Sequence, residues 1–146
     1  MCQVRIYPDA EAIAASAAEE FIRLAVQSIQ IQGRFSAALS GGTTPKALYR
    51  LLADPECQDR LDWGHIHLFF GDERYVRSDH PKSNFRMVKE TLLEKIDIPE
   101  GNIHPVPTDM GVHQAALTYE GILQDCPQMV GGEALQHIHA HARQQR

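Results

Sequence analysis

The sequence predicts an α/β domain with a mainly parallel sheet and helices on both faces. Two short runs, residues 35–39 and 65–70, have the length and apolar character of buried strands. Each run is followed by a polar loop and then by a segment with apolar residues at helical spacing. Strands that alternate with helices form parallel sheets, because each helix carries the chain back to the start of the next strand.

Composition excludes several functional classes. The 146 residues suffice for one domain with a real core. The net charge of −5, with no strong basic block before the C-terminus, leaves no electrostatic footprint for nucleic-acid binding. No apolar run approaches the roughly 20 residues that cross a bilayer, and no secretory signal pattern is visible. Cys2, Cys57 and Cys126 are widely spaced, which predicts free thiols in a reducing compartment and hence a cytoplasmic protein.

The N-terminal segment is predicted to contain a strand and a long helix. Val4–Tyr7 alternates apolar and polar residues, which predicts a first strand at an edge of the sheet. Asp9 suits the N-cap of a helix over residues 10–32, which has one apolar face and a high alanine content. Gly33 is well placed just past its end.

A second helix is expected over residues 45–53. Pro45 suits the first helical position because its missing N–H would have no partner there, and Thr44 can cap the helix. Asp54-Pro55 ends the helix, since the residue before a proline avoids the helical region.

Two further helices are expected, over residues 85–95 and 110–123. Between them, residues 102–107 are extended, and their prolines exclude a central strand. The candidate caps of the two helices are Ser83 or Asn84, and Thr108 or Asp109.

The stretch Ser40-Gly41-Gly42-Thr43-Thr44-Pro45 joins a strand to a helix through two glycines. Glycines allow a sharp turn and the close approach of an anion, and a helix N-terminus offers unpaired N–H groups. The hydroxyl groups of Ser40, Thr43 and Thr44 would add donors. The pattern therefore fits a phosphate cradle, although a tight turn that only caps its helix fits it too.

A second polar loop begins with Asp72-Glu73-Arg74 at the end of the third predicted strand. Arg74 offers a planar fork that suits phosphate or carboxylate. Asp72 could orient a general base or act as one. The alternative is an ion-paired loop anchored by Arg74. Arg86 lies near a predicted helix start, where its charge is unfavourable for the helix dipole, so an anion partner would stabilise it. The alternative is that Arg86 lies on a solvated helix face.

Histidines give weaker signals. His65 and His67 alternate with apolar residues on a strand, which is typical of core or rim positions. His80 lies in the polar loop. His137 and His141 would share a helical face and could hold a metal, but no acidic third ligand is spaced to match, which favours a polar tail.

Three motifs together closely resemble those of 6-phosphogluconolactonases, in family order and at family-like spacing: residues 40–45, 69–74 and 80–86. The resemblance covers residues 1–125 and leaves 126–146 as a divergent polar tail. It implies a Rossmann-like fold shared with glucosamine-6-phosphate and ribose-5-phosphate isomerases. It implies hydrolysis of 6-phosphoglucono-1,5-lactone to 6-phosphogluconate in the pentose phosphate pathway, with no metal or organic cofactor.

The resemblance also implies roles for individual residues. Arg74 looks like a contact to the anionic groups of the substrate, Asp72 like a residue that arranges the catalytic water and base, and Arg86 like the family arginine after the asparagine. The related isomerases typically carry tyrosine where this chain has Arg74, which favours the lactonase branch. The substrate and phosphate loop corresponds to Ser40, Gly41, Gly42, Thr43 and Thr44.

The sequence departs from the family pattern after the Tyr119 region. Lactonases continue there into a buried strand and a Gly-x-Gly-x-Asp-Gly-His-Thr-type loop, which supplies the histidine that is thought to act as general base. This sequence reads Cys-Pro-Gln-Met-Val-Gly-Gly from Cys126 onward. We therefore expect a domain truncated at its C-terminus, whose uncovered sheet edge favours a homodimer. A non-catalytic phosphosugar-binding module and a sugar-phosphate isomerase remain the alternative functions.

Overall fold

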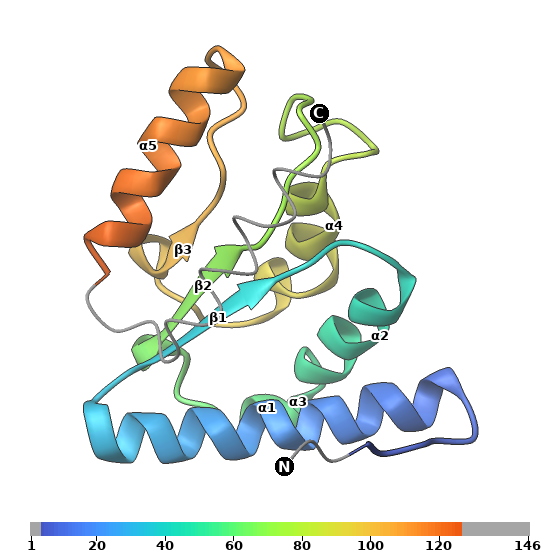
Figure 1. Cartoon of the computed structure of the whole chain (residues 1–146). Coiled ribbons are helices and arrows are strands. Elements are labelled where there is room, and N and C mark those ends of the chain that lie inside the picture. Colours follow the sequence, from blue (N-terminus) through green and yellow to red (C-terminus); the bar gives the residue numbers. More distant parts are fainter. Residues whose placement is uncertain (1–3, 127–146) are drawn as a thin grey trace.

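A computed structural model describes residues 4–126, which form a three-stranded parallel sheet with helices packed against it (Figure 1). The strands lie in the order β1-β2-β3, and both neighbouring pairs are parallel. This arrangement confirms the predicted α/β fold. The helices and strands are α1 (Ala10–Gln32), β1 (Phe35–Leu39), α2 (Thr43–Leu52), α3 (Pro55–Gln58), β2 (Ile66–Phe70), α4 (Asn84–Thr91), β3 (Ile103–His104) and α5 (Val112–Gln124).

Helix α1 begins and ends where its cap residues predict. The Asp9 carboxylate accepts a hydrogen bond from the Ala12 N–H at 2.8 Å. At the other end Gly33 adopts φ 76° and donates its N–H to the Ile29 carbonyl at 2.8 Å. Only glycine adopts that left-handed conformation without strain, so it ends the helix cleanly.

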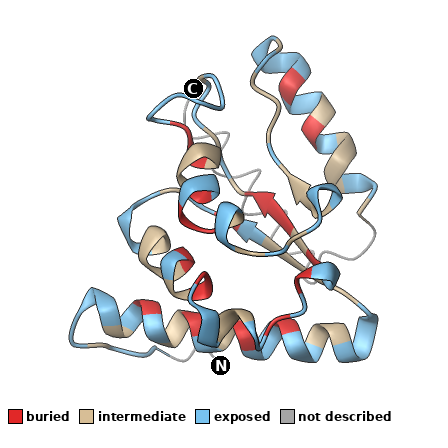
Figure 2. Ribbon diagram, turned by 180° about the vertical axis from the view of Figure 1, so that it is seen from behind, coloured by how far each residue is buried: buried red, intermediate tan, exposed pale blue. Residues whose placement is uncertain are grey.

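The core lies between one face of the sheet and helices α1, α2 and α4. Ile66, Leu68 and Phe70 point into it and are at most 2% exposed. β1 aligns with β2 in exact register from Phe35–Ile66 to Leu39–Phe70, so alternate β1 residues join the same face. Figure 2 shows β2 largely buried, whereas β1 is more exposed. Helix α5 stands beyond β3, away from α1 and α2 (Figure 1).

The predicted strand at Val4–Tyr7 does not form. The segment pairs with no strand of the described part of the chain, and Val4 and Ile6 are 81% and 91% exposed. The segment lies along α1 instead, where the Tyr7 hydroxyl forms a hydrogen bond with the Ser16 hydroxyl. An alternating sequence forms a strand only where a neighbouring strand pairs with it, and residues 4–126 provide none beside this segment.

Helix α2 begins earlier than predicted. Its first residue is Thr43 and its N-cap is Gly42, so the expected cap at Thr44 and the expected first position of Pro45 are wrong. Gly42 adopts φ 111°, and this conformation lets the chain turn into the helix immediately after the second glycine. Pro45 is tolerated within the first turn because backbone N–H groups there have no helical partner.

The later helices follow the predictions with small shifts. The Ser83 hydroxyl caps α4 by accepting the Arg86 N–H at 3.2 Å, as expected for one of the two candidates. The helix ends at Thr91, and Leu93–Lys95 continues as a short 3₁₀ turn. Gly111, rather than Thr108 or Asp109, precedes α5. β3 is a two-residue strand at the edge of the described sheet, consistent with the prolines that follow it.

Two buried tyrosines bind the backbone where β1 and β2 end. The Tyr49 hydroxyl accepts the Ser40 N–H at 2.9 Å and donates to the Ser40 carbonyl at 2.8 Å. The Tyr119 hydroxyl does the same at Phe70, at 2.7 and 3.0 Å. Burial raises the pKa of both phenols, that of Tyr119 to about 12. Both strand ends, and hence the loops after them, are thereby held in place.

The chain beyond residue 126, with His137 and His141, lies outside the described residues. Among residues 4–126, no helix combines the length and apolar character needed to cross a bilayer.

Two half-buried histidines make the stability of the sheet depend on pH. His67 on β2 and His104 on β3 stack with their ring nitrogens 3.2 Å apart, and His104 also stacks on Phe69. Burial lowers the pKa of each imidazole, and the nearby Arg34 lowers that of His67 further. The unfolded chain therefore takes up protons at a higher pH than the folded one. We expect the free energy of unfolding to fall as the pH drops below about 6.5.

Urea titrations at pH 7.5 and 5.5 measure this effect. The double substitution His67→Gln and His104→Gln should flatten the decrease in the urea midpoint. An equal decrease in wild type and variant would show that other groups cause it.

Candidate functional site

The candidate site lies where β1 and β2 end. Parallel strands with adjacent ends place the loops that follow them at one edge of the sheet, which is where ligands bind in open α/β sheets. The loop after β1 contains Ser40, Gly41 and Gly42, and the loop after β2 runs from Gly71 to Ser83. Asn84, the first residue of α4, bridges the two loops, because its side chain packs on Gly41 and donates to the Asp72 carbonyl at 3.2 Å.

The glycine loop presents its polar groups outward. The side chains of Ser40, Thr43 and Thr44 are exposed. The first turn of α2 carries no acidic residue, whereas Lys46 lies within it. A cation at a helix N-terminus is unfavourable for the helix dipole but adds to the attraction for an anion. Lys46 was not among the predicted site residues, although its position directly after Pro45 could have indicated it.

Gly41 must be glycine because of Asn84. A Cβ at position 41 would lie 2.1 Å from the Asn84 Oδ1 atom, well inside van der Waals contact. The amide of Asn84 therefore fixes the distance between the two loops. In the sequence Asn84 appears as a possible helix cap and within the motif 80–86, whereas in the structure it joins the loops.

Substitution of Gly41 tests this contact. We expect Gly41→Ala to destabilise the protein by about 1–3 kcal/mol, because either Asn84 or the loop must move. Gly121→Ala is the matched control: nothing lies within 4 Å of a Cβ there, and the residue sits inside α5. That change should stabilise the helix by about 0.5–1 kcal/mol. Equal unfolding midpoints for the two variants would contradict the tight contact at Gly41.

Glu73 organises the second loop. Its Oε1 atom accepts the N–H groups of Asn84 and Arg74, each at 2.7 Å. Its Oε2 atom accepts the Phe85 N–H at 2.8 Å and the Ser83 hydroxyl at 3.1 Å. The carboxylate thus binds the free N–H groups at the start of α4, where the helix dipole also favours a negative charge. The acidic cluster was conspicuous in the sequence, but this role was not predicted.

Asp72 and Arg74 flank Glu73, and both are exposed. Burial is the main cause of the raised pKa of Tyr49, and the negative charge of Asp72 adds to it. Among the described residues, the Arg74 guanidinium has no ion pair or hydrogen bond. The alternative of a loop anchored by an Arg74 ion pair therefore finds no support in residues 4–126.

Arg86 is engaged within the protein. Its Nε donates to Glu90 at 2.7 Å, and its NH1 group donates to the Asp79 carbonyl at 2.8 Å. The ion pair with Glu90 raises the pKa of Arg86 and lowers that of Glu90. Arg86 therefore ties the loop to α4, and an anion at this position would share the guanidinium with Glu90.

The remaining loop histidine, His80, is exposed, and its Nδ1 accepts the Lys82 N–H at 3.1 Å. Within residues 4–126, no group of three or more His, Cys, Asp or Glu side chains is arranged to hold a metal ion.

Residues 8–139 match the family described as glucosamine-6-phosphate isomerases/6-phosphogluconolactonase. The chain belongs to this family. It is 44% identical over 122 residues to a 6-phosphogluconolactonase of Nostoc sp., a match that covers 83% of this chain and 49% of the relative. A 6-phosphogluconolactonase of Synechocystis sp. is 48% identical over 107 residues, covering 73% and 43% respectively.

Solved structures of the family have the same fold. The chain superposes on 6-phosphogluconolactonase from Thermotoga maritima with a TM-score of 0.76 at 29% identity, covering 85% of this chain and 54% of the other. The enzyme from Trypanosoma brucei gives a TM-score of 0.76 at 26% identity, with 92% and 54% covered. The chain thus spans about half the length of the relatives it matches.

Proposed function

We propose that the edge formed by the glycine loop and the loop after β2 binds a sugar phosphate and contributes to the hydrolysis of 6-phosphoglucono-1,5-lactone. The observation that carries the proposal is the bridge that the Asn84 side chain forms between the two loops. Exposed hydroxyl groups, a helix N-terminus and the Arg74 guanidinium, which has no partner among residues 4–126, belong to the segments on either side of this bridge.

In this proposal each group has a defined task. The N–H and hydroxyl groups of residues 40–44 bind the phosphate or another anionic group of the substrate. Arg74 binds a second anionic or carbonyl oxygen through its planar fork. Asp72 orients the water that attacks the lactone carbonyl. The water oxygen bonds to the carbonyl carbon, the bond between that carbon and the ring oxygen breaks, and a proton from the water passes to the ring oxygen, which becomes a hydroxyl group of 6-phosphogluconate. The free thiols of Cys57 and Cys126 suit a reducing compartment such as the cytoplasm.

The affinity for 6-phosphogluconate tests the role of Arg74. We expect Arg74→Ala to weaken binding about 10-fold or more, since a charge-assisted contact contributes about 1.5–3 kcal/mol. The melting temperature should barely change, because the side chain is exposed and unpaired within the described residues. Arg77→Ala is the control, since Arg77 lies in the same loop but pairs with Asp79 at 3.0 Å. Equal affinities for the two variants would refute the assignment.

Two other functions make different predictions. A non-catalytic module would bind the phosphosugar but hydrolyse lactone no faster than the spontaneous reaction. An isomerase would interconvert aldose and ketose phosphates, with Asp72 or Glu73 moving the proton. Glu73 is less suited to that task, because its oxygens accept four hydrogen bonds from residues of the loop and α4. A glucosamine-6-phosphate deaminase structure at 19% identity shares the fold alone.

A further inference from the structure

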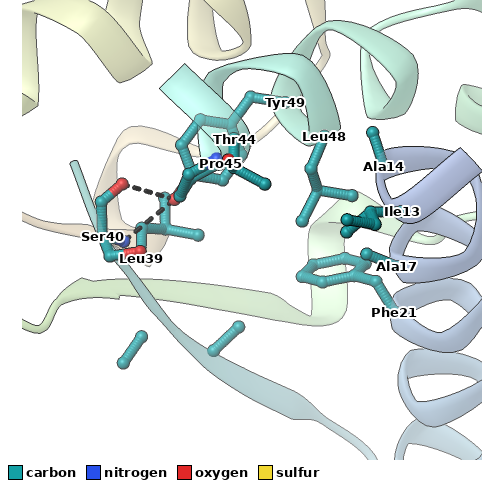
Figure 3. Close-up of a pocket in the computed structure, with 12 residues that line it drawn as sticks. Ile13, Ala14, Ala17, Phe21, Leu39, Ser40, Thr44, Pro45, Leu48 and Tyr49 are labelled. Carbon is teal, nitrogen blue, oxygen red and sulfur yellow. Dashed lines mark hydrogen bonds between the residues drawn. The ribbon is translucent and has the colours of Figure 1, made fainter. Parts of the chain in front are cut away.

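The two loops of the candidate site start from residues that buried tyrosines hold. Tyr49 and Tyr119 are 2% and 8% exposed, so neither lies on the surface that a ligand would touch. Figure 3 shows the Tyr49 hydroxyl beside Ser40, with its hydrogen bonds to the Ser40 N–H and carbonyl as dashed lines. A single side chain thus binds both backbone groups of one residue, which fixes the direction in which the chain leaves β1.

Tyr119 holds the end of β2 by separating it from β3. The Gly71 N–H bonds to the Leu39 carbonyl of β1, so the Phe70 N–H points the other way, toward β3. A continuing parallel ladder would join that N–H to the His104 carbonyl. The Tyr119 hydroxyl stands between them instead: it accepts the Phe70 N–H at 2.7 Å and lies 3.3 Å from the His104 carbonyl oxygen. The two strands end at this hydroxyl, and the loop after β2 begins directly beyond it.

Each hydroxyl contacts the start of one loop only. Tyr49 belongs to α2 and binds the residue before the two glycines, whose backbones have wide conformational freedom. Tyr119 belongs to α5 and binds Phe70, four residues before Arg74. A loop that is ordered in the free protein loses less conformational entropy when a ligand binds, so its affinity is higher.

We propose that Tyr49 and Tyr119 are positioning residues for the sugar phosphate: Tyr49 sets the conformation of the glycine loop, and Tyr119 that of the loop which carries Arg74. The inference rests on the proposed function, since both residues act on that site without touching the ligand. Removing either hydroxyl frees its loop, which must then be ordered when the ligand binds. A cost equal to one ordinary hydrogen bond weakens the affinity about 5-fold.

The first test measures the affinity of the full chain for 6-phosphogluconate by titration calorimetry. We expect Tyr49→Phe and Tyr119→Phe each to weaken binding about 5-fold. Tyr7→Phe is the matched control and should leave the affinity unchanged, because its hydroxyl binds Ser16 on α1 and no loop of the site. Circular dichroism establishes that each variant is folded at the temperature of the assay. Wild-type affinity in both Tyr49→Phe and Tyr119→Phe would overturn the inference.

A double-mutant cycle with Arg74→Ala distinguishes positioning from a general loss of stability. In the Tyr49→Phe background, Arg74→Ala should still weaken binding about 10-fold, as in the wild type. In the Tyr119→Phe background the same change should weaken it less than about 3-fold, because the guanidinium is no longer held in place. Lower stability alone would act on both backgrounds alike. Equal effects of Arg74→Ala in the two backgrounds would therefore overturn the inference.

NMR order parameters recorded without ligand keep this inference distinct from the proposed function. Tyr49→Phe should increase the mobility of Gly41 and Gly42, and Tyr119→Phe that of residues 71–74, each leaving the other loop unchanged. A wild-type chain that does not bind 6-phosphogluconate at millimolar concentration would refute the proposed function and the role of the tyrosines in binding. The order parameters would then still show whether each hydroxyl sets its own loop. Unchanged order parameters in both variants would overturn the positioning itself.

Discussion

Replacing Glu73 by alanine is expected to destabilise the protein by about 3 kcal/mol and to lower its Tm by about 10 °C or more. The carboxylate accepts four hydrogen bonds, three of them from backbone N–H groups. Alanine leaves the N–H groups at the start of α4 without their partner and removes a charge that the helix dipole favours. The loop that carries Asp72 and Arg74 would then lose its attachment to α4.

Glu94→Ala is the matched control for Glu73→Ala. The Glu94 carboxylate is exposed and lies 3.9 Å from the Lys89 ammonium, so its loss should cost less than about 0.5 kcal/mol. The destabilisation by Glu73→Gln should fall between those of the two alanine variants. The amide keeps one acceptor oxygen, but it places N–H donors where the other oxygen accepted hydrogen bonds. Urea unfolding of the three variants measures the series. A Glu73→Ala variant as stable as Glu94→Ala would show that the cap contributes little.

Lactone hydrolysis by this chain alone is expected to be about 10²–10⁴-fold slower than that by the full-length Nostoc relative, because a positioned general base typically contributes that factor. In the two described loops the only imidazole is that of His80, which is exposed and bound to the Lys82 N–H. Asp72, the other candidate in these loops, is exposed as well. The loops can still bind the substrate.

The measurement is the rate of lactone hydrolysis by purified chain, corrected for the spontaneous reaction. His80→Gln serves as the control, since it should leave any residual rate unchanged. Turnover equal to that of the relative would show that a base within this chain has been overlooked. A rate that disappears in His80→Gln would identify that base.

The sequence correctly predicted those helices, strands and loops whose type or ends are decided by residues inside them or directly beside them. Asp9 and Gly33 bound α1 because each cap acts on backbone groups three or four residues away. β2 was recognised because an interior parallel strand is apolar along its length, and it is almost fully buried. The glycine loop was recognised because a strand, two glycines and a helix follow one another directly in the sequence.

The elements that were missed depend on partners far away in the sequence. Val4–Tyr7 alternates like a strand, but only a neighbouring strand could have made it one. The Glu73 carboxylate binds residues 10 to 12 positions later, and Tyr119 binds Phe70 across 49 positions. Gly42 is the N-cap of α2 and has a positive φ. Residue preferences alone do not specify that this residue adopts such a conformation. These contacts are set by tertiary packing.

The most direct test of the proposed sugar-phosphate site is an amide NMR titration of the full chain with 6-phosphogluconate. If the sugar phosphate binds at this site, the largest shifts occur at residues 41–44, at Arg74 and at Asn84, which joins the two loops. Shifts confined to other regions at millimolar ligand, with these amides unmoved, would contradict it.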